Sequence, residues 1–166
     1  DLNLGDEFIP SIHNDLLKIA VIERHKNTGN IGLGIINGLK IESGAIATTI
    51  AHDSHNLIVC GTNDLDMLKA IENLKNIQGG ISICKDGKIL ASLSLEVGGL
   101  ITERPVDEVL KDLENLHNAI DIIAPKINFN PFLTLSFLSL PVIPSLKITD
   151  KGLFNVDKFS FIDVAE

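Results

Sequence analysis

Four strand-like segments follow one another in the first part of the chain, and no helical pattern separates them. The connections between them are short and carry glycine, asparagine and other polar residues, which is typical of turns. Parallel strands need long crossover connections, so this arrangement favours a mixed sheet over a doubly wound parallel one. The segments are residues 17–24, 31–39, 45–50 and 57–61.

A helix and then a hairpin are predicted to follow these strands. Asn63 is placed to cap the helix, and the Gly79-Gly80 pair ends it. Asp86-Gly87 between the β-rich residues 81–85 and 88–95 is typical of a type I′ hairpin. The apolar stripe of the helix consists of Leu65, Leu68, Ile71 and Leu74.

A second amphipathic helix is predicted from Pro105 to the residues before Pro125. A short, almost wholly apolar helix begins at Pro131, and residues 159–162 form a last strand. The stripe of the second helix consists of Val106, Val109, Leu110, Leu113, Leu116 and Ile120. Together the elements predict an α/β sandwich of the α+β kind, in which mixed β-sheet layers carry the two amphipathic helices on one side.

The length of 166 residues predicts a single domain that spans residues 1–166. Its apolar fraction of 45% and mean hydropathy of +0.26 are high for a free-standing soluble domain. This surplus predicts that a partner domain or subunit covers part of the surface. The chain begins at Asp1 without a methionine, which indicates a piece of a longer protein.

The charge of the chain excludes some classes of partner. The net charge is -8, from 14 basic and 22 acidic residues, and the basic residues form no stripe, so nucleic acid is not expected as a partner. A membrane span is not expected either, because Pro141 and Pro144 interrupt the apolar residues 131–146. Cys60 and Cys84 lie in apolar segments and are predicted to be buried free thiols.

Glycines in the second strand segment predict a close approach by another backbone or a ligand, or a bulge. Gly32 and Gly34 both lie in residues 31–39. With Gly38 they resemble a dinucleotide fingerprint, but the third glycine is one residue late and no helix pattern begins there. We therefore do not interpret these glycines as a nucleotide site.

The densest polar stretch is residues 51–56, between the third and fourth strand segments. It contains His52, Asp53, Ser54, His55 and Asn56 in succession. A loop held between two rigid strands is a common place for functional groups. The structural alternative is a polar turn in which Asp53 and Asn56 cap their own backbone.

The residues of this loop allow three kinds of chemistry. His52 and His55 have an H-x-x-H spacing, but a catalytic zinc needs a third protein ligand, which His25 or Asp53 would have to supply. Ser54 between Asp53 and His55 resembles a triad, although adjacent side chains diverge too far for triad geometry. Neutral imidazoles that recognise a polar ligand are favoured over both.

Several segments resemble the C-terminal domain of bacterial and archaeal adenine deaminases, members of the amidohydrolase superfamily. The resemblance extends in order from Leu17 to Ile162 without large gaps. The segments are VIERH (21–25), TGNIG (28–32), GAIATTIAHDSHN (44–56), VCGTND (59–64), PFLTLSFLSLPVIP (131–144) and TDKGLF (149–154).

The resemblance implies that the full-length protein hydrolyses adenine to hypoxanthine and ammonia in cytoplasmic purine salvage. In that family a (β/α)8 barrel holds a divalent metal (Mn, Fe or Zn) that activates water. The H-x-H motif of the barrel has no counterpart in this chain. No metal or other cofactor is therefore expected in this fragment, which should be inactive by itself.

The hypothesis for the site is that residues 51–56, together with Arg24 and His25, face the barrel mouth and close or read the purine pocket. The candidate residues are Arg24, His25, His52, Asp53, Ser54, His55 and Asn56. The alternative is a non-catalytic interdomain or oligomerisation domain, in which the same loop only fixes an interface. Expected partners are the protein's own barrel, adenine and further copies in a homo-oligomer, with residues 131–146 as a second interface candidate.

Overall fold

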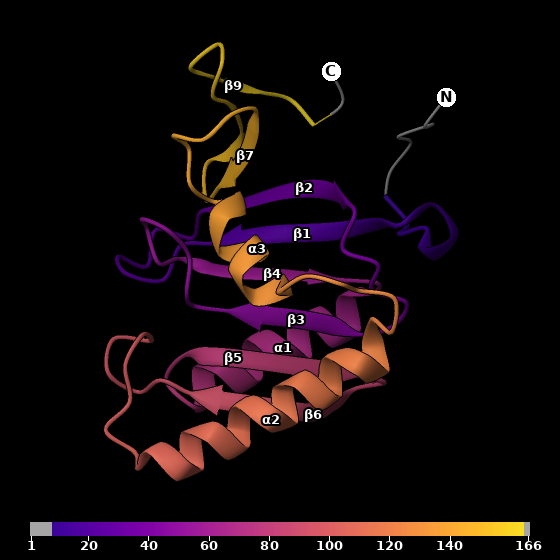
Figure 1. Cartoon of the computed structure of the whole chain (residues 1–166). Coiled ribbons are helices and arrows are strands. Elements are labelled where there is room, and N and C mark those ends of the chain that lie inside the picture. Colours follow the sequence, from indigo (N-terminus) through magenta and orange to yellow (C-terminus); the bar gives the residue numbers. More distant parts are fainter. Residues whose placement is uncertain (1–7, 165–166) are drawn as a thin grey trace.

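The computed structural model describes residues 8–164, which form two antiparallel sheets and three α-helices (Figure 1). The larger sheet has the strand order β2-β1-β4-β3-β5-β6. Its strands are β1 (Leu16–Ile22), β2 (Ile31–Asn37), β3 (Ala45–Thr48), β4 (Leu57–Gly61), β5 (Gly80–Lys85) and β6 (Lys88–Ser94). The other elements are a 3-10 turn η1 (Ile12–Asn14), α1 (Asp64–Asn76), α2 (Val106–Ile123), α3 (Pro131–Leu138), β7 (Leu146–Thr149), β8 (Gly152–Asn155) and β9 (Ser160–Ile162).

The predicted α+β class is confirmed. The pairing is simpler than the mixed sheet predicted, because every strand pair in the larger sheet is antiparallel. The connections in the first part of the chain are too short for a parallel crossover, so each strand runs against its neighbour. The single domain predicted for residues 1–166 stays a prediction, since both ends lie outside the described residues.

Polar side chains determine where the strands end. β4 has the predicted bounds, whereas β1 ends two residues early because the Glu23 carboxylate binds the following turn. It accepts the backbone N–H groups of Lys26 and Thr28 at 2.7 and 2.9 Å. β3 ends at Thr48, whose hydroxyl accepts the N–H of Ile50 at 3.0 Å.

The two long helices lie on opposite faces of the larger sheet, α2 in front and α1 behind in Figure 1. The side chains of β3 alternate between the two faces. Ala45 and Ala47 pack in the cluster that includes Ala70 of α1, and Ile46 packs in the cluster that includes Leu116 of α2. The prediction that both helices lie on one side is wrong. β3 and β4 are buried along their whole length, so both of their faces need a cover.

α1 is rotated relative to the predicted stripe. Its buried residues are Asp66, Met67, Ala70 and Leu74, while Leu65 and Leu68 are exposed. The rotation follows from Asp66, whose carboxylate accepts the Gly87 N–H at 2.7 Å and the Asn63 side-chain amide at 2.8 Å. Because these donors satisfy the carboxylate, the helix can turn a charged residue toward the sheet.

The stripe predicted for α2 is right for Val109, Leu113, Leu116 and Ile120 and wrong for Val106 and Leu110. Leu116, Ala119, Ile120 and Ile123 are buried, whereas Val106 and Leu110 are exposed. The helix packs against β5 and β6, and its first turns extend past the sheet in Figure 1. Apolar periodicity alone does not reveal where a helix leaves the sheet that it covers.

The apolar segment from Pro131 forms the short helix α3, as predicted. Asn130 caps it, and its side-chain oxygen accepts the Leu133 N–H at 3.1 Å. Leu135 and Ser136 are buried, while Leu133 and Phe137 are exposed. Among residues 8–164, no helix is long and apolar enough to cross a membrane.

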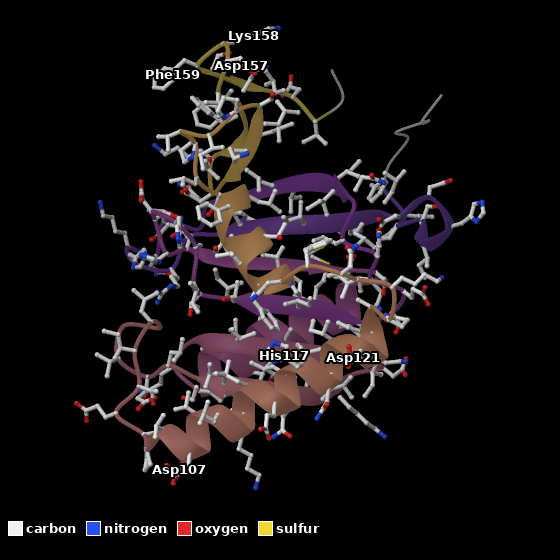
Figure 2. All side chains as sticks on the ribbon, viewed as in Figure 1. Asp107, His117, Asp121, Asp157, Lys158 and Phe159 are labelled. Atoms are coloured by element: carbon white, nitrogen blue, oxygen red, sulfur yellow. The ribbon has the colours of Figure 1, made fainter. Side chains whose placement is uncertain are left out.

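The last predicted strand belongs to a second sheet with the order β7-β8-β9, of which β7 and β8 were not predicted. This sheet packs against β2, and Phe159 projects from the turn between β8 and β9 (Figure 2). Gly32 permits the packing, because a Cβ there would lie 1.8 Å from the carbonyl oxygen of Thr149. The predicted close approach of another backbone at Gly32 is confirmed.

Gly32→Ala should therefore separate the small sheet from β2. The free energy of unfolding should fall by about 3 kcal/mol, the upper part of the range for an overpacked site. Urea denaturation monitored by circular dichroism measures the change. Gly29→Ala is the control, because its site is open and costs about 1 kcal/mol through its positive φ alone. Equal losses in the two variants would show that the Thr149 backbone yields at little cost.

Candidate functional site

The loop of residues 51–56 joins β3 to β4 at one end of the larger sheet. The turn after β1 and the connection between β6 and α2 reach the same end (Figure 1). Both adjoining strands are buried, so the loop has rigid supports on both sides. The His55 N–H donates to the Ala51 carbonyl at 2.6 Å, which closes the loop on itself.

Arg24 links the loop to the connection that follows β6. Its Nε donates to the His55 carbonyl at 2.5 Å, and its Nη2 donates to the Gly98 carbonyl at 2.8 Å. A Cβ at Gly99 would lie 2.9 Å from Arg24 Nη2, so the guanidinium lies directly against this backbone. Burial lowers the pKa of Arg24 from its usual value. The guanidinium thus holds two loops together at the end of the sheet.

His25 and Glu23 hold the turn after β1 against the same loop. His25 Nε2 lies 2.8 Å from the Ser54 carbonyl oxygen, so this nitrogen carries the proton and donates. The Glu23 carboxylate accepts backbone N–H groups from the turn. These bonds, led by the one from Thr28, lower the pKa of Glu23 to about 2.

α3 holds the His52 end of the loop. The His52 N–H donates to the Ser136 carbonyl at 3.1 Å, and the Ser139 hydroxyl donates to the His52 carbonyl at 3.1 Å. The His52 and Phe137 rings lie 4.6 Å apart between centroids. Contacts with a helix more than eighty residues later in the chain therefore fix the backbone at His52.

The Asn56 end of the loop is tied to the turn between β7 and β8. Asn56 Nδ2 donates to Asp150 Oδ1 at 3.2 Å, and Asn30 Nδ2 donates to Asp150 Oδ2 at 3.1 Å. Asn56 is buried, and its N–H also donates to the Ser54 hydroxyl at 3.3 Å. Asp150 thus bridges the loop and the turn after β1 through its two carboxylate oxygens.

Three buried polar atoms of the loop have no hydrogen-bond partner within residues 8–164. They are Nδ1 of His52, Nδ1 of His55 and Oδ1 of Asn56. The His52 and His55 rings lie 6.3 Å apart between centroids. Burial, followed by the neighbouring His52 and Arg24, lowers the pKa of His55 from its usual value. A neutral imidazole offers one donor and one acceptor, so this loop presents hydrogen-bonding capacity that the chain itself does not use.

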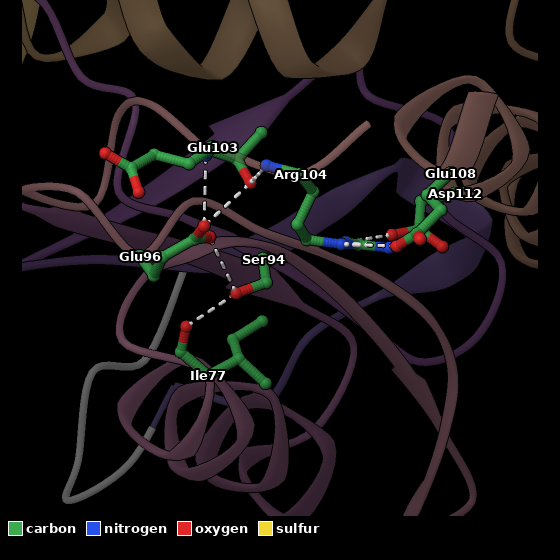
Figure 3. A network of polar contacts seen from close by, with 8 residues as sticks. Ile77, Ser94, Glu96, Glu103, Arg104, Glu108 and Asp112 are labelled. Atoms are coloured by element: carbon green, nitrogen blue, oxygen red, sulfur yellow. Dashed lines mark hydrogen bonds and ion pairs between the residues drawn. The ribbon is translucent and has the colours of Figure 1, made fainter. Parts of the chain in front are cut away.

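A polar network braces the connection between β6 and α2 (Figure 3). The tip of this connection accepts a hydrogen bond from Arg24 at Gly98. The Glu96 carboxylate accepts the Thr102 hydroxyl at 2.9 Å and the Glu103 N–H at 3.1 Å. Its own N–H and that of Glu103 hold the pKa of Glu96 below its usual value. Arg104 pairs with Asp112 of α2 at 2.6 Å. The connection is therefore held at both ends.

Thr49 attaches the tip of this connection to the sheet. Its hydroxyl donates to the Gly99 carbonyl at 2.6 Å and accepts the Gly80 N–H at 2.8 Å. Thr49 lies two residues before the loop and is buried. The loop, the connection and the sheet thus form one hydrogen-bonded unit.

This geometry bears on the metal, triad and thiol chemistry considered for the loop and the cysteines. Within residues 8–164, no group of three or more His, Cys, Asp or Glu residues is placed to hold a metal ion. The Ser54 hydroxyl accepts the Asn56 N–H, and its carbonyl faces His25. Cys60 and Cys84 are buried free thiols, as predicted. Burial raises the pKa of both, that of Cys84 to about 12.

Comparison with known proteins decides the family. The family model described as "Adenine deaminase C-terminal domain" matches residues 2–160. The chain belongs to this family. Relatives named adenine deaminase come from Halalkalibacterium halodurans (54% identity, 94% of this chain) and Geobacillus kaustophilus (55%, 95%). A relative from Carboxydothermus hydrogenoformans, named adenine deaminase 2, is 49% identical over 97% of this chain. The chain spans 27% of the length of the first two relatives and 28% of the third.

In this adenine deaminase C-terminal domain, the structure gathers the candidate residues at one end of the sheet. Arg24, His25, His52, Ser54, His55 and Asn56 are joined directly or through one another, and Asp53 lies exposed among them. Sequence reasoning missed Thr49 and Asp150 as parts of this unit. Asp150 lies in TDKGLF, one of the segments that carry the resemblance, which was a usable signal. The contacts from α3 had no local signal.

The turn after β1 should depend on the charge of Glu23. Its folded pKa of about 2 lies below the unfolded value near 4.5, so its stabilisation is complete above pH 4.5 and is lost as the pH falls toward 2. Glu23→Gln should lower the midpoint of urea unfolding at pH 7, and the difference from wild type should shrink between pH 4.5 and pH 2. Glu114→Gln, an exposed change on α2, controls for net charge. A difference that stays constant with pH would rule out the carboxylate as the cause.

Proposed function

We propose that the full-length protein containing this chain is an adenine deaminase, which hydrolyses adenine to hypoxanthine and ammonia. The family match and the names of relatives about 50% identical over almost the whole chain support the proposal. The relatives are more than three times as long as this chain, which leaves room for a separate catalytic domain. We further propose that the protein acts in cytoplasmic purine salvage and assembles as a homo-oligomer.

The role proposed for this chain is to complete the purine pocket of an amidohydrolase barrel with residues 51–56, Arg24 and His25. The observation that carries it is the set of three unpartnered buried atoms on one loop. A buried polar group without a partner costs about 1–3 kcal/mol. Three such groups close together on one loop mark a place where the fold accepts a cost, which is common at functional sites.

The chemistry of these atoms suits a purine edge. Adenine presents an amino donor beside ring-nitrogen acceptors, so it needs donors and acceptors in alternation. The His52 and His55 rings each carry an Nδ1 without a partner, and Asn56 Oδ1 is left as an acceptor because Nδ2 already donates to Asp150. The low pKa of His55 favours the neutral ring near pH 7. Arg24 acts through the backbone, since its bonds to the His55 and Gly98 carbonyls position the loop.

The divalent metal proposed for the barrel (Mn, Fe or Zn) would activate the water that attacks the purine ring. The residues described here do not form a set of ligands for it. The contribution of this chain is therefore to position the substrate, to exclude water and to hold the pocket closed.

Removal of the His55 ring from the full-length protein tests this role. His55→Asn keeps a residue that tolerates the positive φ of 48° at this position and deletes the imidazole. The ratio kcat/KM for adenine should fall by about tenfold to a hundredfold, which corresponds to the loss of one or two satisfied hydrogen bonds. Release of ammonia measures the rate. His117→Asn on the exposed surface of α2 is the matched control and should not change it.

The measurement separates the two roles considered for this domain. His52→Gln, measured beside His55→Asn, tests the other imidazole while it keeps a polar side chain against Phe137. Turnover at the wild-type level in both variants, with altered oligomeric size, would overturn the pocket-closing role. It would instead favour an interdomain or oligomerisation function.

A further inference from the structure

The free edge of the larger sheet is a surface that the proposed activity does not use. β2 ends the sheet on one side and β6 ends it on the other. Proteins usually protect such edges with charged side chains, prolines, bulges or a covering helix, because an open edge pairs with other chains. The two edges of this sheet differ in that protection.

Among residues 8–164, β6 is protected and β2 is not. β6 begins with Lys88, faces a bulge between Ile83 and Cys84 of β5, and packs against α2. β2 extends over seven residues, Ile31–Asn37, without a charge or a proline. The small sheet packs on the glycine face of β2 and forms a separate sheet, so it does not pair with this edge. An unprotected edge strand of this kind can pair with a strand of another chain.

The register shows which backbone groups point outward. The Glu23 N–H donates to the Asn30 carbonyl, so the hydrogen-bonded pairs between β1 and β2 include Val21 with Gly32. The alternate residues Ile31, Leu33 and Ile35 therefore direct their N–H and C=O groups away from the sheet. Ile31 and Leu33 also have side chains that are 56% and 64% exposed.

A groove of about 450 Å³ follows this edge. Residues 31–33 of β2 line it together with residues 151–153 and 161–164. Phe161 and Val164 are exposed, and Lys151 and Asp163 are the two charged residues of the lining, of opposite sign. The groove thus combines unpaired backbone groups of β2 with apolar side chains. These are the two features that bind an added β-strand.

We propose that this groove receives β2 of a second copy of the chain, so that two sheets join into one across a two-fold axis at Leu33. The sequence at the edge, Ile31-Gly32-Leu33-Gly34-Ile35, reads the same in both directions. Antiparallel pairing centred on Leu33 places Leu33 opposite Leu33, Ile31 opposite Ile35 and Gly32 opposite Gly34. Every outward backbone group then meets its counterpart, and large side chains lie opposite large ones.

Charge also favours a second copy at this position. Each chain has a net charge of -8, which opposes self-association over most of its surface. β2 contributes no charged side chain to the contact. This interface specifies the surface of the homo-oligomer proposed above and is independent of the role of residues 51–56, because oligomeric size and adenine turnover are separate readouts.

A charge at the axis should separate the two copies in the full-length protein. Leu33→Lys places two ammonium groups opposite each other and should raise the dissociation constant of the dimer by about tenfold or more. Sedimentation velocity over a dilution series measures it. Leu90→Lys, an exposed leucine on the other edge strand, is the matched control and should leave the association unchanged. Because both side chains are exposed, thermal denaturation should show folded proteins in both cases.

A cysteine at the axis tests the register. Hydrogen-bonded antiparallel pairs have Cα atoms about 5.5 Å apart, which is within the range for a disulfide. Leu33→Cys should form a covalent dimer under mild oxidation and Leu90→Cys should not, while the native Cys60 and Cys84 are buried. An equal mixture of Ile31→Cys and Ile35→Cys proteins should yield the mixed dimer.

Three results would overturn the proposal. They are a monomeric wild-type protein, a dimer that Leu33→Lys leaves intact, and an absence of cross-links in both the Leu33→Cys protein and the mixture. If Leu33→Lys instead lowers the stability of a monomeric full-length protein, another part of the same chain covers the edge and the second copy is excluded. Loss of turnover in His55→Asn with an intact dimer would leave both proposals standing.

Discussion

The antiparallel pairing of β3 with β4 is the constraint on which the rest of the structure depends. Both strands are buried on both faces, so the pair lies at the centre of the sheet and requires a helix on each side. Its connecting loop carries the polar residues 51–56, and the two strands hold it at the sheet end. The position of the candidate site is thus a consequence of core packing.

Local chemistry in the sequence predicts local structure well. Asn63 caps a helix and Asp86-Gly87 turns a hairpin, as predicted, because each acts within a few residues. The faces of the helices are not local properties. Leu65 and Leu68 match a helical stripe, yet the buried hydrogen bonds of Asp66 turn another face inward. The opposite placement of α1 and α2 likewise depends on which face of β3 each helix reaches.

The candidate site shows the same division between local and distant causes. The density of polar residues in the loop was visible in the sequence, and Gly32 predicted a close backbone approach. The partners of the loop come from Arg24, Asp150 and α3, which are distant in the chain. No periodicity brings Asn56 to Asp150, because their contact exists only after the small sheet packs on β2. The hydrogen bonds that hold the loop therefore depend on tertiary packing and not on local sequence.

Two features of this domain remain unsatisfied within residues 8–164, and they differ in kind. The loop at the sheet end encloses single polar atoms that have no partner. The β2 edge leaves a repeating row of backbone groups beside exposed isoleucine and leucine, which suits another strand. The barrel contact proposed at the loop end and the second copy proposed at the β2 edge use different surfaces. One small domain can thus serve a pocket and an assembly together, because its central strands hold both surfaces in fixed positions.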